Sequence, residues 1–379
     1  MKVAVIGAGV SGLTFAAAMR KAAPDVEIAL YERDPSPTHR PQGYAIGLRN
    51  GTGLAALGEL GLRGAVVGSD SIRVTNLAFT NQAGQTLLSL KSSPDDPNTT
   101  YRVQRLHLKQ VLLEAAEPRR VQFGARCLGY VHANGRVIAA FEDQSQVEAD
   151  YLIACDGAAS AIRQQLVGDH KRYLGLVSIH AEAPIEVEHP LLDGGCFLTM
   201  GKNGCSFFCY RQPGGVCWSY VVHADSEASI ADQPEDVLLQ RVQSETRDWH
   251  DLVPRFVAAA KADTIGVRGY YDKEPIKRVH EVRVWVIGDA AHPMCPFQGQ
   301  GANMALVDSV RLARLLATPR DPQETEKVDA DIVKRGRDAV LESRNNARRF
   351  HETNAFARVR RDLAFRTASL FIGLFRSRT

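Results

Sequence analysis

The chain has 379 residues, of which 45% are apolar and 23% charged, and its formal net charge is +3. That length is too great for one ordinary core, so two or three domains are expected, and the composition excludes a disordered or fibrous protein. No apolar run reaches the ~18 residues of a membrane span, and seven Cys without a CxxC pair argue against a disulfide framework or a metal site.

The first expected element is a strand at Lys2–Ile6, whose β-branched run is typical of a buried strand. It leaves no room for a signal peptide before it, so we expect a cytoplasmic protein. The loop Gly7-x-Gly9-x-x-Gly12 follows and opens a helix rich in Ala and Leu. Gly7 would allow a tight turn, Gly9 would let the backbone approach a pyrophosphate, and Gly12 would let helix and strand pack closely.

The second expected strand, VEIALYE, ends at Glu32, 20 residues after Gly12. An acid in this position binds the ribose hydroxyls of adenosine and repels a 2′-phosphate. It therefore favours NAD or FAD over NADP at this binding site. The alternative is a purely structural glycine turn.

Two later intervals, from about Ile72 to Thr99 and from about Lys171 to Lys273, carry no glycine-loop signal. The second contains strand-like CSFFCYR and VCWSYVVH around a turn at Gln212–Gly215, which predicts a hairpin in an antiparallel sheet. Its aromatic side chains are expected to line a cavity for a planar, largely apolar substrate: Phe208, Tyr210, Trp218 and Tyr220. The alternative is that half of these rings pack beneath a helix.

A second strand-loop-helix pattern appears far downstream. A strand is expected at Val282–Ile287, and Gly288-Asp289 ends it before a helix that begins near Asn303. One NAD would not need two such turns, whereas FAD is longer and carries a polyol between its phosphates and its ring. Asp289 would bind ribityl or pyrophosphate-proximal hydroxyls, and the helix N-terminus would favour the anionic form of the reduced ring.

The C-terminal segment, Asp329–Thr379, is predicted to be helical and is basic, with 12 Lys or Arg against 4 Asp or Glu from Lys334 onward. Such a segment can attract nucleic acid or an anionic membrane. A solvated helix face is the simpler interpretation, so we expect no nucleic-acid partner and no integral membrane association.

Four motifs occur together in one order: GAGVSGL…YERD, YRVQRLHLKQVLLEA, CDGAASAIR and GDAAHPMCPFQGQGANMALVD. In these motifs the chain resembles the single-component, class A FAD-dependent aromatic hydroxylases. Within that class YERDPSPTHRPQG and GYYDKEPIKRV look most similar to the tetracycline-inactivating flavin monooxygenases.

The resemblance implies a set of FAD-binding residues. Glu32 would bind the adenosine ribose with Arg33 beside the adenine, and Arg105 would reach the pyrophosphate or ribityl region. The remaining residues would lie in a loop passing the flavin, in the Asp-Gly motif, and in the second glycine loop: Arg40 and Gly43; Asp156 and Gly157, with Arg163 further on; Gly288, Asp289, Pro296, Gly299, Gly301 and Asn303.

Some of these residues have simpler interpretations. Arg40 or Arg163 is an ordinary surface arginine in one alternative, and Asp156 merely caps the following helix in another. The resemblance places His292 in a structural loop. Phe297 is expected to contact both the flavin ring and the substrate.

The implied fold is α/β. A discontinuous Rossmann-like, glutathione-reductase-type FAD-binding domain would comprise residues 1–71, 100–170 and 274–328. A mostly antiparallel substrate domain would comprise residues 72–99 and 171–273, followed by a C-terminal helical segment at 329–379. The protein would be a monomer or a homodimer.

The implied function is that of a monooxygenase in secondary metabolism or antibiotic modification. It would take electrons from transiently bound NADPH or NADH and use O2 to hydroxylate a planar aromatic or polyketide-like molecule through a C4a-hydroperoxyflavin. Because the chemistry is borne by the flavin, no catalytic side chain is predicted. The alternatives are an enzyme that performs Baeyer–Villiger oxidation, a reductase, a halogenase and a non-catalytic FAD-fold binding protein. The Trp-x-Trp-x-Ile-Pro segment that halogenases carry is absent from this sequence.

Overall fold

The computed structural model describes residues 1–39, 45–318 and 321–376, and the chain groups into two compact units. The first unit comprises Met1–Ser69, Val103–Arg172 and Tyr271–Arg344; the second comprises Asp70–Arg102, Tyr173–Tyr270 and the chain from Asn345 onward. The predicted fold class is confirmed, with a mostly parallel sheet, a mostly antiparallel sheet and C-terminal helices. The segment 329–379, expected as one separate part, is divided between the units after Arg344.

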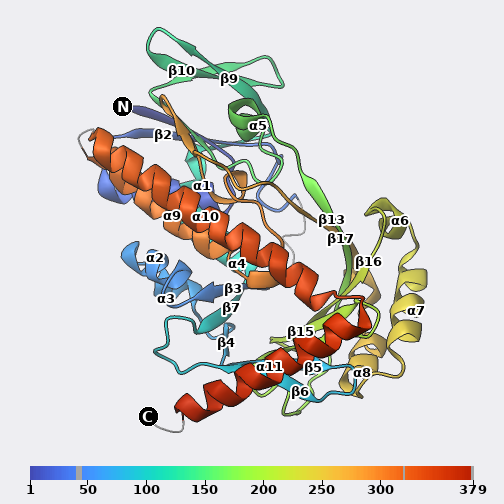
Figure 1. Ribbon diagram of the computed structural model, residues 1–379. Coiled ribbons are helices and arrows are strands. Elements are labelled where there is room, and N and C mark those ends of the chain that lie inside the picture. The colour runs from blue at the N-terminus through green and yellow to red at the C-terminus, as the bar shows by residue number, and fades with distance from the viewer. Residues whose placement is uncertain (40–44, 319–320, 377–379) are drawn as a thin grey trace. The chain divides into compact units, whose positions relative to one another are not determined.

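A six-stranded sheet forms the centre of the first unit (Figure 1), in the order β18-β19-β12-β1-β2-β8. Neighbouring strands are parallel except β18 and β19. The strands are β1 (Lys2–Ile6), β2 (Glu27–Glu32), β8 (Val121–Phe123), β12 (Tyr151–Ala154), β18 (His280–Glu281) and β19 (Val284–Val286). The middle strands are continuous apolar runs because both faces of a parallel sheet are covered by other elements.

The remaining strands of this unit are β3 (Ala45–Arg49) and a three-stranded antiparallel sheet of β9 (Cys127–Ala133), β10 (Arg136–Phe141) and β11 (Gln146–Ala149). Its helices are α1 (Val10–Ala22), α2 (Gly53–Glu59), α3 (Arg63–Val66), α4 (Arg105–Ala116), α5 (Ala161–Val167), α9 (Gly301–Ala317) and most of α10 (Pro322–Phe350). Helix α1 packs against both α4 and α9.

The strand expected at Val282–Ile287 is shorter than predicted. Val282 is 70% exposed and Arg283 has φ +64°, so these residues form the turn that joins β18 to β19. The predicted strand was too long because the alternation of apolar residues continues through the turn of a short hairpin.

A seven-stranded sheet forms the second unit, in the order β17-β13-β16-β15-β14-β5-β6. The strands are β5 (Asn76–Asn81), β6 (Thr86–Lys91), β13 (Arg172–Ala183), β14 (Gly195–Met200), β15 (Ser206–Gln212), β16 (Gly215–His223) and β17 (Gly266–Asp272). A short strand, β4 (Ile72–Val74), pairs antiparallel with the first three residues of β7 (Thr100–Gln104). The helices are α6 (Ala228–Ala231), α7 (Glu235–Thr246), α8 (Leu252–Ala258) and α11 (Ala355–Arg376).

One face of this sheet forms the core of the second unit. Phe207, Trp218 and Tyr220 lie on that face and pack with apolar side chains of α7 and α8. Figure 1 shows both helices alongside the sheet. The rings of Phe207 and Trp218 stack at a centroid distance of 5.5 Å. The seven cysteines are all buried, and none of them forms a disulfide. No helix in the described part of the chain is long and apolar enough to span a bilayer.

His351, which follows the end of α10 in the second unit, is a buried neutral histidine. Its Nδ1 lies 2.7 Å from the Ala347 carbonyl oxygen, so Nδ1 carries the proton, and its Nε2 lies 2.8 Å from the Ser206 hydroxyl. Burial lowers the pKa of His351 to about 4, and the nearby His223 and Arg361 add to this effect.

We expect His351 to make the second unit acid-sensitive. In the unfolded chain a histidine takes up its proton near pH 6.5, so below that pH protonation favours unfolding until the folded pKa is reached. Between pH 7 and pH 4.5 this single group should remove about 2 kcal/mol of unfolding free energy.

Urea denaturation across this pH range checks the prediction. On acidification, the unfolding free energy of His351→Gln should fall by about 2 kcal/mol less than that of the wild type. His170→Gln, at an exposed position, is the control and should leave the profile unchanged. Parallel profiles for the wild type and His351→Gln would contradict the assignment.

Candidate functional site

The carboxyl ends of four parallel strands meet at one edge of the first unit's sheet. Gly7 follows β1, Glu32 ends β2, Asp156 comes two residues after β12, and Gly288 comes two residues after β19. Ligands of open α/β sheets bind outside this edge, where the connections leave in opposite directions. Residues from three distant parts of the sequence are therefore gathered where a dinucleotide would bind.

The first glycine loop is tight at two positions and open at the third. A Cβ on Gly7, which has φ +100°, would lie 2.4 Å from the Cys155 carbonyl oxygen, and a Cβ on Gly12 would lie 1.9 Å from the Gly7 oxygen. A Cβ on Gly9 would meet no atom within 4 Å. This matches the division of roles expected from the sequence, because only Gly9 faces open space through which a phosphate can approach the backbone.

The second glycine loop lies directly against the first. Gly288 has φ +61°, and a Cβ there would come within 2.8 Å of the Ser11 side chain at the start of α1. Further along, the Ser11 and Ser309 hydroxyls are 3.1 Å apart and join α1 to α9. The two loops, some 280 residues apart in the chain, therefore form one site.

Both loops lead into helices whose first turns are available to an anion. The N-cap residues of α1 and α9 are Gly9 and Gln300, and neither caps its helix with a side chain. The amide groups of a first helical turn lack partners within the helix and carry the positive end of its dipole. Asp289 is exposed, and its Oδ1 lies 3.5 Å from where a Cβ on Gly301 would stand, so its carboxylate is at the start of α9.

Glu32 and Asp156 are fixed by backbone amides. The Ala8 amide donates to Glu32 Oε2 over 2.7 Å, and the Asp34 amide donates to Oε1 over 3.0 Å. Asp156 Oδ2 accepts from Ala161 at the start of α5, as the capping interpretation required. Its Oδ1, however, is buried without a hydrogen-bond partner in the described structure, and burial raises the pKa of this carboxyl group.

These observations fit FAD. The open face at Gly9 and the N-terminus of α1 suit its phosphates, and the N-terminus of α9 suits the anionic form of its reduced ring. The carboxylates of Glu32 and Asp289 suit its ribose and ribityl hydroxyls. The orphaned Oδ1 of Asp156 is a further acceptor at the same edge.

The other predicted cofactor residues occupy varied positions. Arg33 is exposed just after β2, Arg105 is half-buried and begins α4, and Gly157 has φ +81°. Pro296 and Gly299 are exposed, and Phe297 is half-buried, in the turn before α9. Arg40 and Gly43 lie outside the described residues.

Arg163 is not the surface arginine of the simpler interpretation. It is 1% exposed, it donates to Asp169 Oδ2 through Nε over 2.9 Å, and it also donates to the Ala290 and Ala291 carbonyl oxygens. It thereby fixes α5 to the second glycine loop. His292 is likewise structural, since its Nε2 lies 2.5 Å from the buried carboxylate of Asp308.

Asn303 holds the site together through its amide group. Its Oδ1 accepts from the Arg49 amide over 2.8 Å and the Gly53 amide over 3.2 Å, and its Nδ2 donates to the Gly47 and Gly299 carbonyl oxygens over 3.0 Å. The side chain is fully buried and thus joins α9 to the turn between β3 and α2. Its role in the cofactor site stays a prediction, but these contacts make it a positioning residue.

We expect Asn303→Ala to destabilise the protein by about 3 kcal/mol, because two buried amide donors and two carbonyl acceptors lose their partner. Urea denaturation measures the loss. Asn345→Ala, at an exposed position in α10, is the control and should change stability by less than about 0.5 kcal/mol. Equal stabilities of the two variants would show that the Asn303 contacts carry little free energy.

In the second unit, the predicted aromatic wall is split between two faces. The hairpin register pairs Cys209 with Trp218 and Phe208 with Ser219, so Phe208 and Tyr210 lie on the face opposite Trp218. Tyr220 donates its hydroxyl to Glu245 over 2.7 Å within the α7 side of the core. The expectation that all four rings line one cavity is therefore corrected: Trp218 and Tyr220 pack beneath helices, and only Phe208 and Tyr210 remain candidates.

Arg102 lies within the motif YRVQRLHLKQVLLEA, in which a role was predicted only for Arg105. The guanidinium carbon of Arg102 lies 4.3 Å from the centroid of the Tyr210 ring and 5.2 Å from that of Phe208. Its Nε is buried without a hydrogen-bond partner, and no carboxylate of the described residues forms an ion pair with it. A half-buried cation over two aromatic rings thus lacks a counter-charge.

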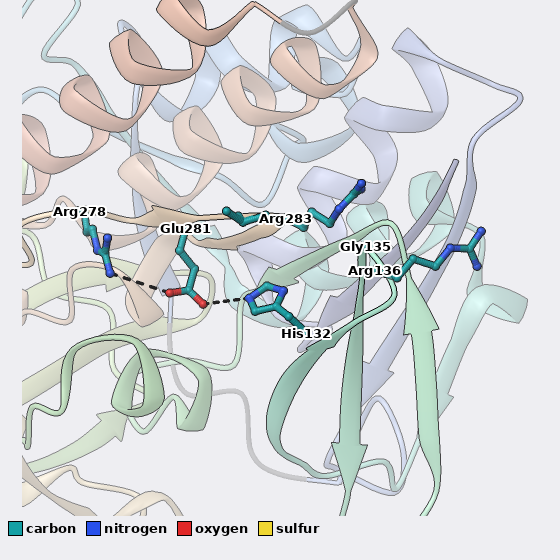
Figure 2. A pocket seen from close by; sticks show the side chains of 7 residues that line it. His132, Gly135, Arg136, Arg278, Glu281 and Arg283 are labelled. Atoms are coloured by element: carbon teal, nitrogen blue, oxygen red, sulfur yellow. Dashed lines mark hydrogen bonds and ion pairs between the residues drawn. The ribbon is translucent and has the colours of Figure 1, made fainter.

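A pocket of about 500 Å³ lies elsewhere on the first unit. It is lined by the β9–β10 and β18–β19 hairpins: His132, Gly135, Arg136, Arg278, Glu281, Val282 and Arg283. Figure 2 shows Arg278 and His132 approaching the Glu281 carboxylate while Arg136 and Arg283 point away from it. The β18–β19 turn precedes β19 whereas Gly288 follows it, so this pocket is at the opposite edge of the sheet from the glycine loops.

Comparisons with known proteins agree with this geometry. A family model described as an FAD binding domain matches residues 1–328. The chain is 29% identical over 330 residues to 3-amino-4-hydroxybenzoate 2-monooxygenase of Streptomyces cremeus, covering 86% of this chain and 81% of that protein. It is 27% identical over 351 residues to an FAD-dependent urate hydroxylase of Klebsiella pneumoniae, covering 91% and 89%. The crystal structure of Klebsiella pneumoniae HpxO with FAD and uric acid has the same fold, with a TM-score of 0.85, 24% identity, and coverage of 97% and 93%.

Proposed function

This chain belongs to the FAD-binding family of class A monooxygenases, and from that premise we propose that it hydroxylates a planar aromatic small molecule that carries an acidic group. FAD, when bound, supplies the redox chemistry, with NADPH or NADH as the electron donor and O2 as the oxidant. The protein's part is to bind and orient both molecules and to exclude water.

The observation that carries the substrate class is Arg102. A half-buried charge without a counter-charge is destabilising, so a site that keeps one is suited to a ligand that brings the opposite charge. A carboxylate or phenolate would pair with the Arg102 guanidinium, and its ring would extend the apolar surface of Phe208 and Tyr210. The curated relatives named above act, by their names, on an aminohydroxybenzoate and on urate, which supports this class.

Resemblance to tetracycline-inactivating enzymes adds a polyketide-like ring system, and with it antibiotic modification, as a special case. Arg102 is compatible with that case, because an ionised enol would meet the same guanidinium.

The test is an anaerobic absorption spectrum of the purified protein with NADPH and then NADH, repeated with a panel of ligands. The panel contains 3-amino-4-hydroxybenzoate, salicylate, urate, a tetracycline, and salicylamide as the uncharged match to salicylate. We expect one nicotinamide to bleach the flavin faster with an acidic ligand than with salicylamide, and air to restore the spectrum. The product should carry one added oxygen atom, and its fragmentation would separate hydroxylation from Baeyer–Villiger insertion.

Two results would overturn the proposal in different ways. A flavin that neither nicotinamide reduces with any ligand would favour a reductase or halogenase. Reduction that is equally fast with salicylamide and salicylate would leave the monooxygenase standing and remove the acidic substrate class.

A further inference from the structure

Helix α11 carries an exposed apolar stripe. Phe356, Val359, Leu363 and Leu370 are 77%, 67%, 63% and 69% exposed. Their spacings of three, four and seven residues place them within about 40° of one line along the helix, over about 21 Å. Single exposed apolar residues are ordinary, but four in line form a surface that normally has a partner.

The opposite side of α11 accounts for its position in the fold. Phe365 is buried and its ring meets Phe79 of β5 edge-on, with a centroid distance of 5.5 Å, and the helix also packs on β6 (Figure 1). Arg361, also buried, pairs with Asp362 over 2.7 Å. The helix is therefore held by one face, and the stripe is not needed to attach it to the second unit.

The stripe has a positive border on both sides. At 100° per residue, Arg360 and Arg366 lie about 60° to either side of Leu363, and both are exposed. Residues 355–376 contain five arginines and a single acid, Asp362, which faces Arg361. An apolar line with an exposed arginine on each side is the pattern of a helix that lies in the plane of a membrane surface.

We propose that α11 binds the surface of an anionic lipid membrane, with its apolar stripe inserted among the acyl chains and its arginines among the headgroup phosphates. A second copy of this chain fits the surface poorly. Any stripe-to-stripe contact brings arginines of both copies together, and like charges repel. The proposal concerns peripheral attachment only and is independent of the enzyme's substrate.

Flotation of the full-length protein with lipid vesicles tests this. Phosphatidylcholine vesicles are compared with vesicles of phosphatidylcholine and phosphatidylglycerol in a 7:3 ratio. We expect the wild type to bind the anionic vesicles at least about tenfold more tightly, and 0.5 M NaCl to remove most of that preference by screening.

The variants locate the surface. Leu363→Asp should reduce binding at least about tenfold, and Arg360→Gln with Arg366→Gln should abolish the preference for anionic lipid. Val282→Asp, at a position 70% exposed in the first unit, is the matched control and should bind like the wild type. Circular dichroism verifies that each variant is folded, as expected for exposed positions.

Three outcomes would overturn the proposal. The wild type fails to bind the anionic vesicles, or Leu363→Asp binds them as well as the wild type does. In the third, the protein binds no vesicles, and light scattering shows a dimer that the substitution Leu363→Asp dissociates. The stripe would then be a contact between two copies of the chain. Binding to polyglutamate but not to vesicles would point instead to an acidic protein partner.

Discussion

Gly9→Ala is expected to fold normally and to bind FAD at least about 100-fold more weakly. Gly9 has φ −83° and ψ −170°, a conformation that alanine adopts without strain, and its Cβ would meet no protein atom within 4 Å. The methyl group would instead occupy the space through which the pyrophosphate approaches the backbone. The loss therefore falls on the cofactor and spares the folded chain.

Fluorescence titration of the apoprotein with FAD measures the affinity, and thermal unfolding of the apoprotein measures the stability. Gly12→Ala provides the contrast, because its Cβ would collide with the Gly7 oxygen and should disrupt the fold itself. Gly58→Ala, in α2 where a Cβ meets nothing, is the neutral control. Normal FAD affinity in Gly9→Ala would show that the cofactor does not lie over this loop.

Arg102→Met is expected to raise the KM for an acidic aromatic substrate about thirty-fold. A charge-assisted hydrogen bond contributes about 2 kcal/mol, which corresponds to that factor. Methionine keeps much of the stem that lies over Tyr210 and Phe208 while removing the charge. The KM for an uncharged analogue such as salicylamide should change by less than about threefold, since it makes no ion pair.

Steady-state kinetics with both substrates separates charge from packing. Arg73→Met, at an exposed position of β4, removes an arginine of the same unit and should affect neither KM. If Arg102→Met weakens both substrates equally, Arg102 acts through the shape of the aromatic face. If it weakens neither, the substrate binds elsewhere.

The glycine loops show where sequence reasoning succeeds. The turn at Gly7, the packing at Gly12 and the acid at Glu32 follow from local rules of backbone space and charge, which act over a few residues. The length of FAD predicts that the two loops lie close together. The close approach of Gly288 to the Ser11 side chain is the contact that brings them together.

The aromatic wall shows where sequence reasoning fell short, although the signal was present. A two-residue turn between Gln212 and Gly215 fixes the pairing of Cys209 with Trp218, and that register already places Phe208 and Trp218 on opposite faces. Alternation within each strand places side chains on one face or the other, and the register between the strands decides which side chains share a face.

The sequence by itself determined the fold class, the FAD-binding family and the positions of both glycine loops, because each depends on short-range patterns of glycine, charge and apolar residues. Only the tertiary structure decided that Arg163 and Asn303 hold the site together, that Trp218 and Tyr220 belong to the core, and that Arg102 lies over Tyr210 without a counter-charge. Those roles depend on which residues distant in sequence come into contact, and the order of residues along one chain does not show those contacts.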